Sequence, residues 1–523
     1  MDIRSALQPL DAVVIIVYII CLIGLGFWIS FRRKESSDLF LAGRDLGWPN
    51  IGFSIFGTNI SPSMMLAACS VAYTSGIVAA NFEWLAWWFL MLLAMVFIPH
   101  YLGTRISTMP EFMERRFDKR CRSFLSWYAL FTTIILWLGG ALYSGGLLLV
   151  QITGWDLWLC LTILVAIATS FTITGGLAAV VYTDTFQSVL MIIASTALTI
   201  IAYIKTGGIS KIVESVPADY WQLFRPASDS TFPWPAIVLG YPVLGIWFWC
   251  TDQTIVQRVL GARDRRQGQL GAVFAGFLKI LVPFIFFMPG IFCFILYPNL
   301  ENPDSAYTML MTNLLPTGLV GLIVAVLIAA LISTIDSALN SFSTIFTLDI
   351  YCDKLRPKAP PKEIRLVGRI MTLIIAVISI FIALSMESVG RDLFNLLQGI
   401  IAFFAPPMSA VFLIGVLWRR ATSKAALYTL IFGSALSLSI GFCQFNNWPS
   451  ETFWPHYMLL SFYLFAALSV FMIVASLVTQ KGSEPSTLPT LRETYAGSKG
   501  SRVIWILWGT LAMIMCVIYL VFN

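Results

Sequence analysis

Apolar segments long enough to cross a lipid bilayer follow one another along almost the whole chain. About 20 apolar residues are needed for a helix to cross, and only helices and closed barrels satisfy their backbone hydrogen bonds in lipid. A mean hydropathy of +0.83 with 11% charged residues predicts an all-α polytopic membrane protein. We expect about 14 transmembrane helices, near residues 11–31, 48–71, 79–101, 124–151, 156–176, 184–204, 235–252, 269–297, 312–349, 364–386, 393–417, 423–442, 456–478 and 503–522.

The basic residues of the chain gather in alternate loops between these segments. Most of the 33 Lys and Arg lie near residues 32–44, 105–122, 258–266, 354–369, 419–424 and 481–502. The positive-inside rule makes these loops cytoplasmic. Both termini are then predicted on the extracytoplasmic side of a plasma (inner) membrane. Because the net charge of +6 follows this topology, we expect the lipid bilayer as a partner and no nucleic acid.

The stretch from Leu327 to Tyr351 lies in an apolar part of the chain, yet it carries ten Ser, Thr, Asp and Asn residues. One face of the expected helix holds Ser333, Ser337, Asn340, Ser341 and Thr344, and Thr334 and Asp336 flank that face. Such a stripe must meet a partner helix or water, because lipid leaves polar groups unpaired. Hydrogen bonding between helices is one interpretation. The density of hydroxyls and the carboxylate favour a site for a hard cation.

The second apolar segment is interrupted by its own residues. Pro62 has no N–H, so the carbonyl of Thr58 loses its helical donor. The alternatives are a simple proline kink and a discontinuous helix whose free carbonyls coordinate a cation at mid-membrane depth. The same turn is crowded by Gly57, Asn59, Ser61 and Ser63.

Four further polar residues lie in apolar segments, where an ionisable side chain marks a functional site by default. Lys279 lies well inside the eighth segment, and Glu83 opens the third, where the outer water interface is the alternative. Asp184 opens the sixth segment, where a helix cap is the more ordinary interpretation. Gln398 in the eleventh segment is compatible with packing between helices.

Ten of the segments form two sets of five, 48–71 to 184–204 and 235–252 to 393–417. An odd number per set gives the sets opposite orientations, as in inverted-repeat transporters, and each set opens with an interrupted segment, GTNISPS or WCTDQ. By analogy, segment 312–349 is expected to pack against segment 48–71. The expected organisation is an extra helix and cytoplasmic loop at 1–47, a first repeat at 48–205, an extracellular loop at 206–234, a second repeat at 235–418 and extra helices at 419–523.

Several motifs in combination resemble the sodium/solute symporter family, and within it the sodium–sugar (glucose/galactose-type) cotransporter branch. They are TNIS at 58–61, FEW at 82–84, YTD at 182–184, WFWCTDQTIVQR at 247–258, GFLK at 276–279, ALISTIDSALNSFSTIFTLDIY at 330–351, and LLQ with APP between 396 and 407. The resemblance covers about residues 10–480. It implies a LeuT-type fold with two inverted five-helix repeats.

The resemblance also implies cation sites. The main sodium site would use Gly57, Ile60, Ala330, Ser333 and Thr334. Some members have a second cation site, whose matching positions are Asp184, Ser333, Asp336 and Ser337. Asp336 departs from the branch, which usually has Ser or Thr there, and a second carboxylate could bind sodium or carry a proton.

A sugar site is implied as well, with donors and acceptors above an aromatic floor. Met64 and Phe248 depart from the branch, which has a polar residue and a tyrosine at these positions. The implied gates are Phe82, Phe248 and Phe394. The implied substrate-binding residues are Asn59, Met64, Glu83, Phe248, Trp249, Lys279 and Gln398.

We therefore expect a secondary active transporter that couples inward sodium flow to uptake of a sugar or polyol, most simply a hexose. Other solutes, such as sialic acid, a nucleoside or an amino acid, are the alternatives on the same scaffold, and a membrane sensor or channel is the alternative of another class. No enzyme is expected, because the nine Cys form no CxxC pair and no nucleophile–base pair stands out. The coupling ion is expected to be sodium, and no obligate protein partner is expected.

Overall fold

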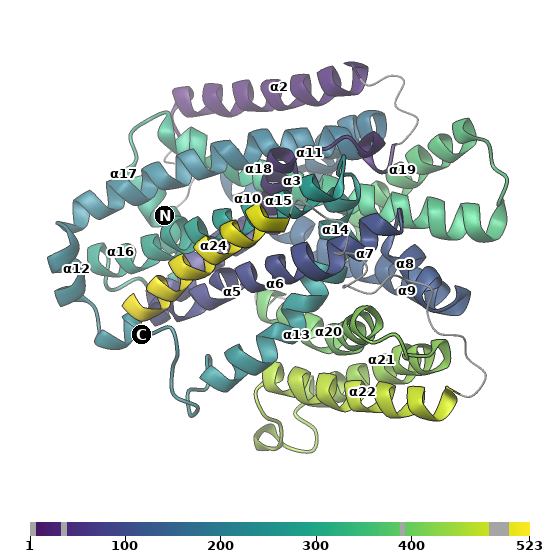
Figure 1. The fold of residues 1–523 in the computed structure, drawn as a ribbon. Coiled ribbons are helices and arrows are strands. Elements are labelled where there is room, and N and C mark those ends of the chain that lie inside the picture. Colours follow the sequence, from purple (N-terminus) through teal and green to yellow (C-terminus); the bar gives the residue numbers. More distant parts are fainter. Residues whose placement is uncertain (1–6, 33–38, 387–392, 481–500, 523) are drawn as a thin grey trace.

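A computed structural model describes residues 7–32, 39–386, 393–480 and 501–522, almost all of them helical, and no strand is present in these ranges. Figure 1 shows the helices lying roughly side by side in one bundle. Short helices include α5 (Asn81–Trp84), α12 (Ile209–Ser215), α13 (Tyr241–Gly245) and α17 (Ala306–Leu314). The others are α2 (Pro9–Arg32), α3 (Trp48–Asn59), α4 (Pro62–Ser75), α6 (Ala86–Leu92), α7 (Ile98–Gly103), α8 (Met109–Arg116), α9 (Lys119–Thr132), α10 (Ala141–Thr153), α11 (Leu157–Thr206), α14 (Gln253–Leu260), α15 (Arg265–Val282), α16 (Met288–Leu296), α18 (Leu319–Ile345), α19 (Pro361–Ser385), α20 (Leu393–Leu417), α21 (Ser423–Phe445), α22 (Tyr457–Thr479) and α24 (Ser501–Val521).

Within the described ranges, 11 helices are long and apolar enough to cross a membrane. Two of them, Pro62–Gly103 and Leu157–Thr206, each cover more than one predicted segment. The helix Leu157–Thr206 has 50 residues, about 75 Å at 1.5 Å per residue, and bends at Gly176, whose φ is 54°. The helix at 236–251 is shorter than the rest. The 11 spans are therefore reconcilable with the expected 14, which stays a prediction.

The predicted interruption of the second segment is confirmed. α3 ends at Asn59, Ile60 and Ser61 are extended, and α4 starts at Pro62. Proline fits the first turn of a helix because the N–H it lacks has no partner there anyway. The Ser61 hydroxyl accepts a hydrogen bond from the Met64 amide at 3.2 Å and so caps α4. The sequence TNISPS thus ends one helix and begins another.

The second interrupted helix is also broken at an extended residue whose side chain caps the next helix. The π-helical segment η7 (Ile246–Thr251) ends at Asp252, which is extended. The Asp252 carboxylate caps α14 by accepting from the Thr254 amide at 2.8 Å. A second π-helical segment, η4 (Thr133–Gly140), joins α9 to α10. π-Helical turns are rare and often lie at functional sites.

Helix α18 is the centre of the bundle. In an 18-residue stretch of the continuous helix that α18 forms with the π-helical segment η10 (Phe346–Leu355), 89% of the residues are buried, whereas in α2, at the edge of the bundle in Figure 1, the share is 22%. Asp11 of α2 accepts hydrogen bonds from the Gly318 and Gly321 amides, both at 2.7 Å. A carboxylate at a helix N-terminus is favourable. This contact fastens the outer helix α2 to the start of α18.

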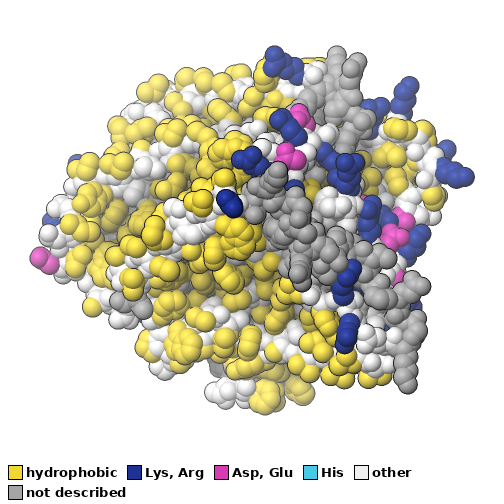
Figure 2. All heavy atoms as spheres, in the orientation of Figure 1, with side chains coloured by type: hydrophobic (Ala, Val, Ile, Leu, Met, Phe, Trp, Pro, Cys, Tyr) yellow, Lys and Arg dark blue, Asp and Glu magenta, His cyan; other side chains and the backbone are white. Residues whose placement is uncertain are grey.

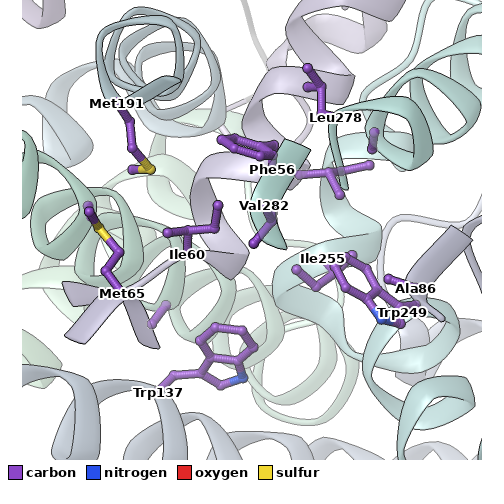
Figure 3. Close-up of a cluster of buried hydrophobic side chains, with 14 of the residues drawn as sticks. Phe56, Ile60, Met65, Ala86, Trp137, Met191, Trp249, Ile255, Leu278 and Val282 are labelled. Carbon is purple, nitrogen blue, oxygen red and sulfur yellow. The ribbon is translucent and has the colours of Figure 1, made fainter. Parts of the chain in front are cut away.

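Apolar side chains close the middle of the bundle around the interruption between α3 and α4. Figure 3 shows Phe56, Ile60 and Met65 beside that break, with Trp137 and Trp249 on neighbouring elements. All five side chains are buried. Polar groups in this region are therefore held away from water, which strengthens their mutual electrostatic interactions.

The basic residues mark one side of the molecule. Figure 2 shows Lys and Arg gathered at the right-hand side of the view, where Figure 1 places α8, α9 and the end of α7, while hydrophobic side chains cover the rest of the visible face. α2 begins and α24 ends on the opposite side. This charge asymmetry is what the positive-inside rule requires, and the direction in which the protein sits in its membrane stays a prediction.

Candidate functional site

A buried polar cluster surrounds Lys279 of α15. Its Nζ lies 2.5 Å from Glu83 Oε2 of α5 and donates a hydrogen bond to Asn59 at the end of α3. The Lys279 side chain is completely buried, and that of Glu83 is 9% exposed. The ammonium also lies over the Trp249 ring, 5.1 Å from its centroid. Four of the predicted substrate-binding residues, Asn59, Glu83, Trp249 and Lys279, are thus together in one place.

An aromatic group borders this cluster. The rings of Phe248 and Trp249 lie 4.9 Å apart at 77°, and Phe248 stacks on Trp137 of η4 at 5.4 Å. Phe248 therefore bridges the polar cluster and η4. Met64 is half-buried on α4 and has no polar group to add to the cluster.

The predicted outer gate is described in part. The Phe82 ring packs edge-on against Tyr241, with centroids 5.1 Å apart, and lies 6.2 Å from Phe232 of the loop before η6 (Ala236–Gly240). Tyr241 donates a hydrogen bond to the Phe82 carbonyl at 2.5 Å. Phe394 and Gln398 fall within α20, but their side chains lie outside the described part of the chain.

A second buried cluster centres on Asp184 of α11. Ser333 of α18 donates a hydrogen bond to its Oδ1, and Ser54 of α3 donates to its Oδ2 at 2.5 Å. The Arg258 guanidinium of α14 lies 3.6 Å from the same carboxylate. Asp184 and Arg258 are both completely buried. This carboxylate joins elements far apart in the sequence.

Two expectations are wrong here. Asp184 does not cap a helix, because it lies within α11, well past the bend at Gly176. Arg258 is not a residue of the cytoplasmic loop at 258–266, because its side chain is fully buried and donates hydrogen bonds to Ser54 and Ser337. A buried guanidinium needs a counter-charge, and Asp184 supplies it.

Asp336 extends this cluster on α18. Its Oδ1 accepts a hydrogen bond from Ser337 at 3.3 Å, whereas its buried Oδ2 has no hydrogen-bond partner. The Ser337 hydroxyl also accepts a hydrogen bond from Arg258, so it links Asp336 to the guanidinium that pairs with Asp184. The structure brings the four residues matching a second cation site together, and Arg258 already occupies part of their surroundings. An unpaired carboxylate oxygen beside hydroxyls fits a monovalent cation or a proton.

Two of the residues expected at the main sodium site, Gly57 and Ser333, lie close together. A Cβ added to Gly57 would lie 3.6 Å from the Ser333 hydroxyl, which places this turn of α3 against α18. Thr334 donates its hydroxyl proton to the Ala330 carbonyl at 3.0 Å, one turn earlier on α18, and Ile60 is the extended residue that follows α3. A hydroxyl that donates its proton keeps its lone pairs for a cation. The arrangement can thus present oxygen ligands to sodium.

The contact between α3 and α18 that was expected by analogy is direct. The hydroxyls of Thr58 and Ser337 lie 3.2 Å apart. Ser54 and Thr58, one helical turn apart, both reach Asp184, at 2.5 Å and 3.5 Å. These two residues were missed from the sequence, although their spacing of four places them on one face of the helix opposite the polar stripe. No spacing or motif in the sequence indicates that Trp137 lies near the site.

Comparison with known proteins gives one family. The sequence pattern of the sodium:solute symporter family matches residues 39–433. The sodium/glucose cotransporter 4 of Danio rerio is 32% identical over 83% of this chain and 72% of its own length. The sodium/mannose cotransporter of Bos taurus is 33% identical over 90% of this chain and 87% of its own length. The human sodium/myo-inositol cotransporter 2 is 34% identical over 83% and 70%.

Solved structures share the architecture. A Na⁺-coupled sialic acid symporter, in a substrate-bound outward-open state, superimposes with a TM-score of 0.79 at 23% identity, over 92% of this chain and 100% of the other. The nucleobase-cation-symport transporter Mhp1 follows with a TM-score of 0.56 at 14% identity. At these identities the likeness concerns the fold alone, and it confirms the expected LeuT-type fold.

Proposed function

The chain belongs to the sodium:solute symporter family, and from this premise we propose that it couples inward sodium flow to the uptake of a neutral polyhydroxylated solute, a hexose or a polyol. The relatives at 32–34% identity carry the names of sodium/glucose, sodium/mannose and sodium/myo-inositol cotransporters. These solutes share many hydroxyls and no charge. The action is transport, with no covalent step.

The observation that carries the proposal is the cluster of Lys279, Glu83 and Asn59 beside the Trp249 ring. It offers an ammonium donor, a carboxylate acceptor and an amide that is both, in a buried place. A sugar hydroxyl also donates and accepts, so it can insert between Lys279 and Glu83 and exchange one set of hydrogen bonds for another. An indole face suits the apolar C–H face of a sugar ring. A charged substrate would leave one of the two buried charges of the pair uncompensated.

Sodium enters the mechanism at the contact between α3 and α18. With sodium bound by Gly57, Ile60, Ala330, Ser333 and Thr334, the end of α3 is held in place. Asn59, which belongs to the sugar cluster, is next to Ile60 in the chain, so sodium binding positions a sugar ligand directly. Each sodium that enters draws about 2.3 kcal/mol per 100 mV from the membrane potential.

Alternating access follows from the two interrupted helices. The stacked pair of Phe248 and Trp137 closes the cluster on one side, and Phe82 with Tyr241 closes it on the other. Rocking of the interrupted helices against α18 opens one closure while the other stays shut. Phe394 and Gln398 complete the outer gate and the sugar site, respectively, in this proposal.

The orientation in the membrane is part of the proposal. The side of the molecule that bears Lys and Arg in Figure 2 faces the cytoplasm, and both termini lie on the opposite side of a plasma (inner) membrane. Asp184, Ser333, Asp336 and Ser337 form a second cation site, where Asp336 takes a proton or a second sodium.

The assigned sodium site is tested by uptake into proteoliposomes with the variant Ser333→Ala. We expect sugar uptake to lose its sodium dependence, because one ligand and the hydrogen bond to Asp184 disappear together. The matched control is Ser343→Ala on the same helix, whose hydroxyl donates to the Gly368 carbonyl of α19 at 2.7 Å, away from the site. Unchanged sodium coupling in Ser333→Ala, or equal losses in both variants, would remove Ser333 from the sodium site.

A further inference from the structure

A short helix, α8, lies between the stacked pair of Phe248 and Trp137 and the basic side of the molecule in Figures 1 and 2. A small space beside this pair is bounded by α9, η7, α14 and α20 and has room for about one water molecule. Met109 of α8 and Phe412 of α20 line it, and the Phe112 ring of α8 stacks on Phe412 with centroids 5.9 Å apart. A sugar that leaves past Phe248 toward the basic side therefore needs these elements to separate.

The start of α8 is bonded to two different elements. The Thr108 hydroxyl caps the helix by accepting from the Glu111 amide at 3.1 Å, and it donates to Asp349 of η10 at 2.9 Å. The Met109 amide, which has no partner within its own helix, donates to Gln253 Oε1 of α14 at 2.8 Å. Two consecutive residues thus link α8 to both η10 and α14.

The bond to η10 is reinforced by charge. Arg122 of α9 lies 2.5 Å from Glu114 of α8. It also lies 2.8 Å from Asp349 and 3.3 Å from Asp353, both of η10. The Arg122 side chain is 13% exposed and that of Asp349 is completely buried, so salt screens this pair little. Charge-assisted hydrogen bonds therefore join α8, α9 and η10 into one unit.

The end of α8 is fastened to α20. The buried Arg116 guanidinium donates to the carbonyls of Gly415, Trp418 and Ala421 at 2.5, 2.9 and 3.3 Å. Carbonyls at the end of a helix lack partners within it, and a guanidinium has five donors to offer them. α8 is thus held at its start by η10 and at its end by α20.

The contact between α8 and α14 is weaker than these, because it is one hydrogen bond between neutral groups. Further along α14, Gln257 and Arg258 bond to hydroxyls of α18. The first turn of α14 follows the interruption at Asp252, so it is the part that can swing when the interrupted helix rocks against α18. Because η10 continues α18, the bond from Met109 to Gln253 crosses between the part that moves and the part that stays.

We propose that α8 is an inner latch of the transport cycle, closed in this structure by the bond from Met109 to Gln253 and released when the first turn of α14 swings away. The proposal rests on the proposed function, sodium-coupled transport of a sugar or polyol. Release opens the space beside Phe248 and Trp137 to the cytoplasm, while α8 stays with η10. Water then bonds to the separated amide and carbonyl groups, so the released state keeps its hydrogen bonds.

Chemical modification of one buried position measures how often the latch is open. Thr132 is 3% exposed and lines the small space, so the thiol of a Thr132→Cys variant is expected to react with a membrane-impermeant maleimide only when the inner side opens. The reaction is measured in inside-out membrane vesicles. Peptide mass spectrometry at position 132 separates it from reaction at the nine natural Cys.

Gln253→Met in the Thr132→Cys background removes the acceptor of the Met109 amide and keeps a side chain of similar size. We expect the modification to be about fivefold faster, as the loss of one buried hydrogen bond implies. Gln267→Met is the matched control, because Gln267 Oε1 also accepts a backbone amide, that of Trp48 at 2.9 Å, but joins α15 to α3. The control is expected to stay within about twofold of the background, since it shares no partner with α8.

Thr108→Val tests the latch without a change in α14. It removes the bond to Asp349 and the cap of α8, so we expect a rise of about the same size, about fivefold. Thr108→Ser keeps the hydroxyl that makes both bonds and is expected to stay within about twofold of the background.

Saturating sodium is expected to slow the modification in both fast variants at least about twofold, because sodium at the end of α3 favours the state that is closed inside. Equal rates in Gln253→Met and Gln267→Met, or in Thr108→Val and Thr108→Ser, would overturn the latch. Fast modification that sodium does not slow would overturn it as well, since a general loss of packing has that effect. Failure of the proposed function is distinct: the wild type itself would then take up no sugar or polyol with sodium, whatever the modification rates.

Discussion

Removing one charge of the buried Lys279–Glu83 pair is expected to destabilise the protein strongly. Lys279→Met leaves the Glu83 carboxylate, 9% exposed, without its cation, and leaves the Asn59 side chain without its donor. Breaking a buried ion pair from one side costs about 3–5 kcal/mol. Because Glu83 keeps a little contact with solvent, we expect the lower part of that range, about 3 kcal/mol.

Removing the second charge as well is expected to restore most of the lost stability. The set is completed by Glu83→Gln and by Glu83→Gln/Lys279→Met, and in the double variant the pair is replaced by neutral side chains of similar size, so the penalty of an unpaired charge disappears. We expect the double variant to lie within about 1 kcal/mol of the wild type, a coupling of at least about 2 kcal/mol beyond additivity. The function does not return with the stability, because neither the donor nor the charged acceptor for the sugar is present.

Unfolding by SDS titration in mixed micelles gives the free energies, and sodium-driven uptake by the same four proteins gives the activity. A loss below about 1 kcal/mol in Lys279→Met would show that the ion pair is not a buried one. Sugar uptake at wild-type rates in the double variant would remove both residues from the substrate site, whatever their effect on stability.

Two further outcomes follow from the packing of α3 and α18. Gly57→Ala adds a Cβ that would lie 2.5 Å from the Ser188 hydroxyl, so the end of α3 must shift. We expect the half-saturating sodium concentration in uptake assays to rise about tenfold, as about 1.4 kcal/mol of misfit requires. Gly24→Ala, with open space around its new methyl group, is the control, and equal behaviour of the two variants would contradict the placement of the sodium site. Asp11→Ala removes two hydrogen bonds of 2.7 Å to the first amides of α18, which is expected to cost about 1–2 kcal/mol in the same SDS titration, and an unchanged midpoint would mean that α2 does not stabilise the central helix.

Local chemistry was readable from the sequence wherever one residue dictates it. Pro62 predicts the interruption between α3 and α4, because its missing N–H acts within one turn, and the structure adds the cap that the Ser61 hydroxyl forms there. Lys279 and Glu83 were recognisable as functional because an ionisable group inside an apolar segment has so few alternatives. The resemblance implies only that both bind the substrate, and the structure shows that they lie 2.5 Å apart although 196 positions separate them in the chain.

The rest depended on contacts that no local pattern encodes. Arg258 was assigned to a loop because its neighbours Arg263 and Arg265 are basic, yet its side chain turns inward to Asp184. The sequence predicts a new helix that begins at Asp184, but α11 continues through a bend at Gly176, so Asp184 lies inside a helix and does not cap one. The pairing of Trp137 with Phe248 joins two π-helical segments, and no spacing in the sequence predicts which aromatic rings meet.

The most direct test is uptake of labelled hexoses, myo-inositol, sialic acid and proline into proteoliposomes, with and without an inward sodium gradient. The expected result is accumulation of a hexose or of myo-inositol above its external concentration, only with the gradient and faster when the interior is made negative. Accumulation without sodium would contradict sodium coupling. Sodium-driven accumulation of sialic acid or proline, with none of the neutral polyols, would contradict the sugar site built around Lys279 and Glu83.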